Sequence, residues 1–167
     1  MHKKKLFSLL LMVIMAMAAN AQQALDFVGK FVTQCEGDTT VKCITVSPKM
    51  MEQIVESRQG DDEAHEALNQ AIGKLKSMRI VTARAEYFER AQQLLQKHAR
   101  RFQAEKEYQC DNVRGVFYTR RNRKGKTAEL IMLREDIARN QLTIVCLTGD
   151  IDKEFLCFLY NNKSFKN

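Results

Sequence analysis

The sequence has little proline, little glycine and no tryptophan. Its 167 residues include one proline and seven glycines, and these two residue types dominate linkers and turn-rich segments. Their scarcity leaves no linker-like stretch and no low-complexity segment, and the sequence contains no internal repeat. We therefore predict one domain rather than a string of modules.

Nucleotide-binding and metal-binding motifs are also missing. The chain has neither a Walker loop nor a G-x-G-x-x-G pattern, so nothing predicts a phosphate cradle. No two cysteines have the C-x-x-C spacing of a zinc site. The acidic run at residues 61–63 lacks the ligand spacing of an EF-hand and suits the positive end of a helix dipole. We predict no cofactor and no metal.

Histidine is rare, which limits the catalytic chemistry that the sequence supports. Beyond the first 21 residues only His65 and His98 occur, both in predicted helices. A cysteine nucleophile needs a histidine beside it, and no glycine-rich elbow places a cysteine opposite either one. We assign no catalytic residue. The alternative is a hydrolase or thiol-active enzyme on the sheet, which requires His65 or His98 in a pocket beside a cysteine or carboxylate.

The first 21 residues have the three-part pattern of a secretory signal peptide. A basic start at residues 2–5 precedes an apolar run at residues 6–18 and the small-residue site Ala19-Asn20-Ala21. The apolar run is short for a bilayer span, and no second run of about 18 residues follows, so we predict no transmembrane segment in the mature chain. Cleavage after Ala21 removes three lysines and lowers the formal charge from +7 to +4. We predict export to the periplasm or cell envelope.

All five cysteines follow the predicted cleavage site. An oxidising compartment permits disulfides, but an odd number leaves at least one thiol without an internal partner. The preferred pair is Cys35 with Cys43, which would close a short loop between a helix and a strand. The alternative is that the cysteines are small apolar core residues, as Cys146 inside a predicted strand suggests.

Three apolar runs near the C-terminus, residues 116–118, 130–133 and 142–147, have short polar connections and predict an antiparallel meander. Further strands are expected at residues 40–46, 78–83 and 105–110. Helical periodicity or capping signals predict helices near residues 25–37, 47–55, 64–75, 85–101 and 155–160. Residues 149–152 are expected to form a turn, with Asp152 as the cap of the last helix.

These elements predict a single α+β domain over residues 22–167. Its sheet should be mixed and largely antiparallel, with about five or six strands and helices packed mainly on one face. A right-handed crossover through the helices would make the first two strands parallel.

Four stretches of the chain resemble a family of small exported proteins of Bacteroidetes, the domain-of-unknown-function family numbered 4252. They are residues 41–51, 74–82, 129–133 and 142–152. The resemblance covers nearly all of the mature chain and implies an exported α+β protein, but it implies no catalytic residue. The chain departs from the family at Pro48, where lysine is more usual, and in its several cysteines.

The concentrated polar feature of the sequence is a basic connection between the first two meander strands. Five cations and a glycine suited to positive φ occupy one tight hairpin, so their charges must create a local positive potential. In an exported protein this favours lipid headgroups, lipopolysaccharide phosphates or acidic glycan. The candidate binding residues are Arg114, Arg120, Arg121, Arg123, Lys124 and Lys126.

Two readings of this hairpin remain open. It is either a binding site or a solvated tip whose charges keep it soluble. Nucleic acid is not expected, because no aromatic residues are interleaved with the cations to stack on bases. The sequence favours a non-enzymatic envelope protein that binds an anionic surface or a protein partner, at the hairpin or on an exposed face of the sheet.

Overall fold

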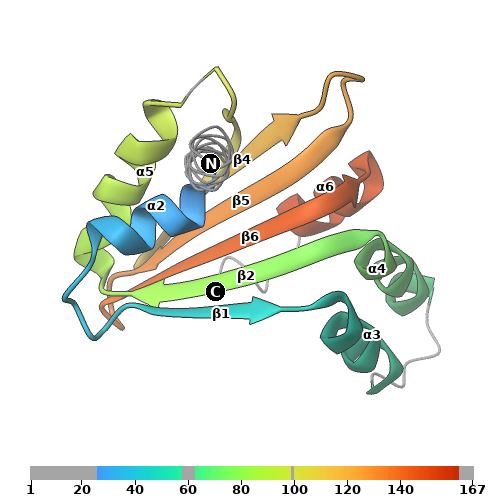
Figure 1. Cartoon of the computed structure of the whole chain (residues 1–167), viewed down its shortest axis with the longest axis horizontal. Helices are drawn as coiled ribbons and strands as arrows, with labels where there is room; N and C mark the ends of the chain where they lie inside the picture. Colours follow the sequence, from blue (N-terminus) through green and yellow to red (C-terminus); the bar gives the residue numbers. More distant parts are fainter. Residues whose placement is uncertain (1–25, 58–62, 99, 162–167) are drawn as a thin grey trace, which may run out of the picture. The chain divides into compact units, whose positions relative to one another are not determined.

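The computed structural model describes residues 26–57, 63–98 and 100–161 (Figure 1). The predicted signal peptide lies outside the described residues. The chain divides into two compact units, residues 1–36 and 37–167. The placement of both parts of 22–167 in one domain stays a prediction.

In the N-terminal unit, the helix α2 (Phe27–Gln34) confirms the first predicted helix. Asp26 caps it, because its carboxylate accepts a hydrogen bond of 3.0 Å from the backbone N–H of Val28. The rings of Phe27 and Phe31 stack on one side, with centroids 6.3 Å apart.

The second unit is built on a six-stranded open sheet in which every pairing is antiparallel. The strand order is β1-β2-β6-β5-β4-β3. This confirms the α+β class and the predicted number of strands. The strands are β1 (Lys42–Val46), β2 (Leu75–Ala83), β3 (Gln103–Cys110), β4 (Val113–Arg121), β5 (Thr127–Asp136) and β6 (Gln141–Ile151).

The helices of this unit lie between β1 and β2, between β2 and β3, and after β6. Among the described residues, no helix of either unit is long and apolar enough to cross a bilayer. The helices of the second unit are α3 (Pro48–Ser57), α4 (Glu63–Gly73), the short 3-10 helix η1 (Ala85–Tyr87), α5 (Phe88–Gln96) and α6 (Lys153–Asn161).

The predicted parallel pairing of the first two strands is wrong, because β1 and β2 are antiparallel. Val46, the last residue of β1, pairs with Met78 near the start of β2. Two helices, α3 and α4, fill the connection and lie side by side (Figure 1). They return the chain to the end of the sheet at which it left, whereas a crossover to a parallel strand must carry it to the opposite end.

The pleat of the strands gives the sheet two faces on which alternate residues lie. Phe117 lies beside Met132 on one side, here named the Phe117 face. Tyr118, the next residue of β4, lies beside Ile131 on the other side, the Tyr118 face.

The Phe117 face carries three of the four described α-helices of this unit, α3, α4 and α6. The ring of Tyr160 in α6 packs edge-on against Phe117, with centroids 4.9 Å apart, and Tyr108 of β3 flanks the same ring at 5.8 Å. Burial raises the pKa of Tyr108 and of Tyr160 to about 12, so both phenols are neutral at physiological pH. The surrounding core consists of Val46, Met51, Ala71, Leu75, Leu130, Met132, Leu147, Ile151, Phe155 and Leu159.

The Tyr118 face carries α5, so helices lie on both sides of the sheet, although most lie on the Phe117 face. The Arg114 guanidinium lies 4.3 Å from the ring centroid of Phe88. Gln92 forms a hydrogen bond to the Tyr118 side chain. Both faces of the sheet therefore carry helices, so neither face is exposed over its whole width.

The end of β6 differs from the expected turn at residues 149–152. The strand runs on to Ile151, and Gly149 lies at a register irregularity where β6 meets Leu75. The predicted helix cap is confirmed, because the Asp152 carboxylate accepts a 2.8 Å hydrogen bond from the N–H of Phe155. That bond and the Lys74 ammonium at 2.9 Å lower the pKa of Asp152.

Candidate functional site

The basic hairpin between β4 and β5 is held in one conformation by Asn122. The side-chain oxygen of Asn122 accepts hydrogen bonds from the backbone N–H groups of Lys124, at 2.9 Å, and Lys126, at 3.1 Å. Its own N–H donates to the carbonyl of Lys126 at 2.8 Å. Gly125 adopts the left-handed φ of 77° that the sequence predicted. The side chains of the tip therefore project from an ordered turn.

Arg120, at the base of the hairpin, has a structural partner. Its guanidinium donates to the Glu129 carboxylate at 2.8 Å. That carboxylate is buried and also accepts a 3.4 Å hydrogen bond from the Cys146 thiol. Because a buried carboxylate needs a compensating charge, Arg120 is committed to neutralising Glu129.

Arg114 does not join the hairpin cations. It lies near the start of β4, six residues from Arg120, which is about 20 Å along a strand. Its guanidinium contacts the carboxylates of Glu135 and Glu89, and these hydrogen bonds raise its pKa, that to Glu135 most. Arg114 thereby joins β4 to β5 and to α5.

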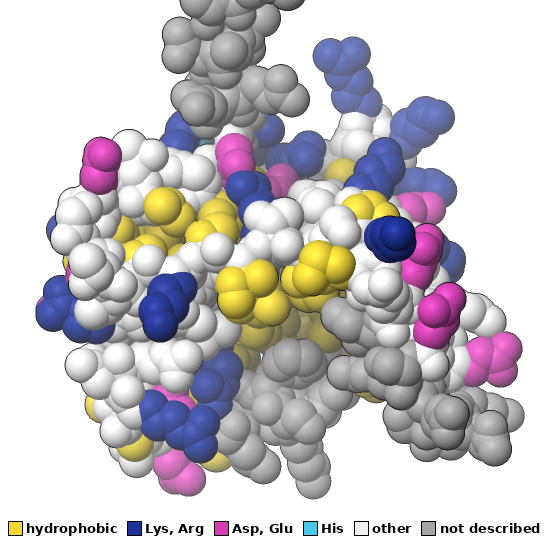
Figure 2. Space-filling model, turned by 60° about the horizontal axis from the view of Figure 1, so that its bottom comes forward, with side chains coloured by type: hydrophobic (Ala, Val, Ile, Leu, Met, Phe, Trp, Pro, Cys, Tyr) yellow, Lys and Arg dark blue, Asp and Glu magenta, His cyan; other side chains and the backbone are white. Residues whose placement is uncertain are grey.

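The remaining four hairpin cations are exposed, and two of them have a carboxylate nearby. Arg121 lies 3.4 Å from Glu105, and Lys126 lies 3.9 Å from Asp150. Exposed ion pairs of this kind contribute little to the free energy of folding, and they leave the cations accessible to an anionic ligand. Arg123 and Lys124 form no ion pair within the described part of the chain. In Figure 2, lysine and arginine side chains gather at the upper right, where this hairpin lies.

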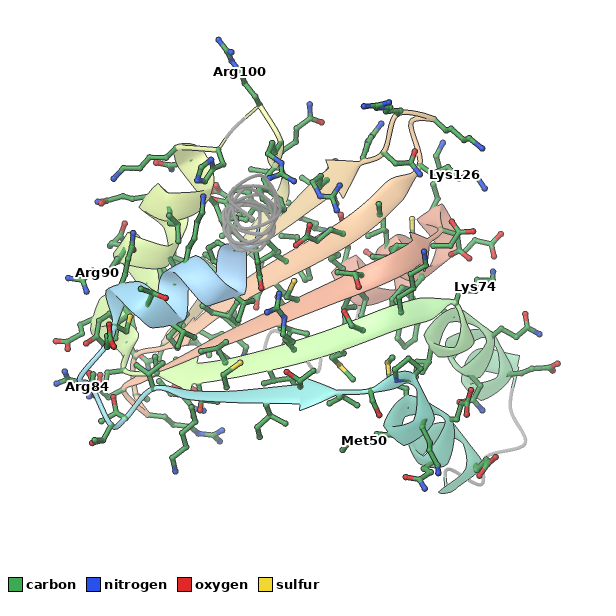
Figure 3. The ribbon with its side chains drawn as sticks, in the orientation of Figure 1. Met50, Lys74, Arg84, Arg90, Arg100 and Lys126 are labelled. Carbon is green, nitrogen blue, oxygen red and sulfur yellow. The ribbon has the colours of Figure 1, made fainter. Side chains whose placement is uncertain are left out.

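A second basic segment reaches the same end of the sheet. Arg100 and Arg101 belong to the turn between α5 and β3, and β3 begins at Gln103, which pairs with Thr119 near the end of β4. Strand pairing thus places this turn beside Arg121. Figure 3 shows Arg100 pointing away from the sheet and labels Lys126 at the hairpin.

These two segments define one surface, here named the basic end. The sequence prediction missed its second segment because about twenty residues separate Arg101 from the hairpin. The local signal was the run Lys97-His98-Ala99-Arg100-Arg101, which could have been recognised as a second cationic group. The basic end comprises Arg100, Arg101, Arg121, Arg123, Lys124 and Lys126.

Comparison with known proteins assigns the chain at the level of a family. The family described as "Domain of unknown function (DUF4252)" matches residues 36–156. The chain belongs to this family. No curated protein and no solved structure matches it.

The DUF4252 region includes all six strands and both segments of the basic end. It also includes His65 and His98, on which the enzymatic alternative depends. His65 belongs to α4, on the Phe117 face, whereas His98 follows α5, on the Tyr118 face. The sheet therefore lies between α4, which contains His65, and α5, which precedes His98.

Among the cavities beside the described part of the sheet are two whose described lining residues include no histidine or cysteine. One, of about 280 Å³, lies between α5 and the β3–β4 pair and is lined by Gln92, Glu107 and Arg114 among others. The other, of about 170 Å³, lies between α3, α4 and β2. Neither has the composition that a thiol-histidine site requires.

The cysteines are thiols in the structure, with Cys43, Cys110 and Cys157 exposed and Cys35 and Cys146 buried. Cys35 and Cys43 belong to different units of the chain, so their disulfide stays a prediction. Across the part of the chain that the structure describes, no three His, Cys, Asp or Glu side chains are grouped to hold a metal ion.

Proposed function

We propose that this DUF4252 protein is an exported, non-enzymatic envelope protein of Bacteroidetes that binds an anionic surface through its basic end. The observation that carries the proposal is the meeting of two cationic segments, one from the β4–β5 hairpin and one from the α5–β3 turn. Export is supported by the signal-peptide pattern of residues 1–21. The anionic groups are phosphates, carried by lipid headgroups or by lipopolysaccharide.

A surface that carries several cations is better suited to bind an extended anionic layer, such as a membrane surface, than a single small ligand. Each Lys or Arg close to an anionic membrane contributes about 1 kcal/mol, and the attraction declines within a Debye length. The tip side chains Arg123 and Lys124 are both exposed, so they can approach such a layer without first breaking an ion pair. Binding should therefore be strongly salt-dependent.

Vesicle co-sedimentation tests this proposal. The chain from residue 22 should bind vesicles rich in phosphatidylglycerol and not vesicles of phosphatidylcholine, and added salt should release it. The double variant Arg123→Glu, Lys124→Glu should bind at least about tenfold more weakly, because two attractive charges become repulsive.

The matched control is the double variant Lys42→Glu, Lys49→Glu, on two exposed residues of β1 and α3, which changes the net charge equally at the opposite edge of the sheet. It should keep most of the binding. An equal loss in both variants would show attraction to net charge alone and would contradict a localised site. Association with envelope fractions that salt does not weaken would instead favour the protein-partner alternative.

A further inference from the structure

The edge strand β1 is open along its outer side. Lys42, Cys43, Ile44 and Thr45 are all exposed, and Ile44 is 58% exposed. Strand β2 covers the inner side of β1, and none of the other described strands lies on its outer side. The backbone N–H and C=O groups on that outer side can therefore form hydrogen bonds with another strand.

The opposite edge of the sheet has the features that prevent such pairing. Strand β3 carries Glu105, Lys106 and Glu107 in succession, and its register with β4 is interrupted between Ala104 and Lys106. Charges and bulges of this kind discourage edge-to-edge association. In β1 the register is regular and the only charged residue is Lys42, at its first position. The β1 edge can therefore pair with another strand more readily than the β3 edge.

Hydrophobic exposure is concentrated near the unprotected edge. Of the four large exposed hydrophobic residues in the described chain, Ile44 lies in β1 and Met50 lies in the first turn of α3, directly after it. Figure 2 turns the β1 side of the sheet toward the viewer and shows hydrophobic side chains at the surface near its centre. Figure 3 labels Met50 beside the end of this strand.

The sequence of β1 is complementary to itself. In an antiparallel pair with a second β1 centred on Ile44, all five residues find a partner. Ile44 then faces Ile44, Cys43 faces Thr45, and Lys42 faces Val46. The two lysines stay apart, and the exposed isoleucines cover each other on one face.

We propose that β1 pairs with β1 of a second copy of this chain, so that two sheets form one antiparallel sheet of twelve strands. The pairing is independent of the basic end and of the proposed function. A five-residue strand pair makes a small interface, so the dimer should be a weak one that depends on concentration.

Analytical ultracentrifugation over a range of protein concentrations tests the pairing. The chain from residue 22 should show a monomer–dimer equilibrium. Ile44→Lys should weaken the dimer at least about tenfold, because it places two ammonium groups opposite each other. Gln103→Lys, on the exposed residue at the start of β3, is the matched control and should leave the dimer unchanged. A monomer at all concentrations, or equal dimerisation of all three proteins, would overturn the proposal.

Cysteine cross-linking tests the register. In a Cys35→Ala, Cys110→Ser, Cys157→Ser background, which also prevents the predicted Cys35–Cys43 disulfide, Thr45→Cys places a thiol opposite Cys43 of the other copy, so mild oxidation should give a disulfide-linked dimer. Further replacement of Cys43 by serine should abolish that dimer. Equal cross-linking with and without Cys43 would contradict pairing centred on Ile44. Circular dichroism of each variant shows whether the fold is kept.

Discussion

At the scale of single residues, Gly149 is a position where only glycine fits. Its φ is 145°, and a Cβ there would lie 2.5 Å from the carbonyl oxygen of Lys74 and 2.7 Å from the Cα of Leu75. Those atoms belong to backbone, which cannot move aside without disturbing the pairing of β2 with β6. The glycine therefore permits a bulge in a continuous strand, where the sequence predicted a turn.

Gly149→Ala should lower the free energy of unfolding by about 2 kcal/mol, from backbone strain and the clash with β2. Urea denaturation followed by circular dichroism measures this. Gly73→Ala is the control, since a Cβ at this last residue of α4 meets nothing within 4 Å. That variant should be neutral or slightly more stable. Similar values for the two glycines would refute the role assigned to Gly149.

Asp38 is a residue whose charge depends on a network of neighbours. Its carboxylate accepts hydrogen bonds from the Tyr87 hydroxyl at 2.6 Å and from Arg84 at 2.9 Å. Both the hydroxyl and the backbone N–H of Thr40 add further bonds. This network, with the Tyr87 bond first, holds the pKa of Asp38 well below its usual 3.8. The contacts tie the segment before β1 to the η1 turn.

The lowered pKa of Asp38 predicts acid sensitivity. Because the unfolded chain binds the proton first, the stabilisation is fully present above pH 3.8 and declines as the pH falls below it. Asp38→Asn should be less stable than wild type at neutral pH and should lose less stability on acidification. Denaturation curves from neutral to acidic pH measure both effects. Tyr87→Phe should reproduce part of the change, and parallel pH profiles for all three proteins would contradict the prediction.

At the scale of elements, the strands decide which cations lie together at one end of the sheet. The sequence grouped six cations by their proximity along the chain. The extended backbone of β4 places Arg114 at the far end of that strand, while the carboxylate of Glu129, directly opposite Arg120, engages that arginine. Pairing of β3 with β4 adds Arg100 and Arg101 in their place. The candidate site is therefore a property of three paired strands and two connections.

The connection through α3 and α4 shows a second effect at this scale. One helix between two strands carries the chain along the sheet, whereas two helices packed together return it to its starting end. The helical pattern predicted both helices, but the consequence for strand direction depends on how they pack. Their apolar residues Met51 and Ala71 meet the same core as Leu75.

At the scale of the whole second unit, the sheet has a core on its Phe117 face that joins it to α6. Phe117 lies between the rings of Tyr108 and Tyr160 and is 2% exposed. Phe117→Ala should therefore lower the free energy of unfolding by about 3–5 kcal/mol. Because the sheet is continuous, the loss should appear as one cooperative transition at a lower denaturant midpoint.

The control for Phe117→Ala is Phe158→Ala, on the exposed side of α6. Phe158 is 37% exposed, so its loss should cost far less. Calorimetry and denaturant titration measure both variants. If Phe117→Ala instead separated α6 from the sheet in an early, distinct transition, this would contradict the prediction that α6 and the sheet unfold as one cooperative unit.

The sequence by itself determined the features that depend on neighbours along the chain. Apolar runs with short polar connections predicted the meander strands, Asp152 capped α6, and Gly125 closed the basic hairpin. The tertiary structure decided strand direction, the partners of Arg114 and Arg120, and the meeting of Arg101 with the hairpin. These depend on pairing between distant segments, whose register is chosen by the packing of both faces together and is not encoded in any local pattern.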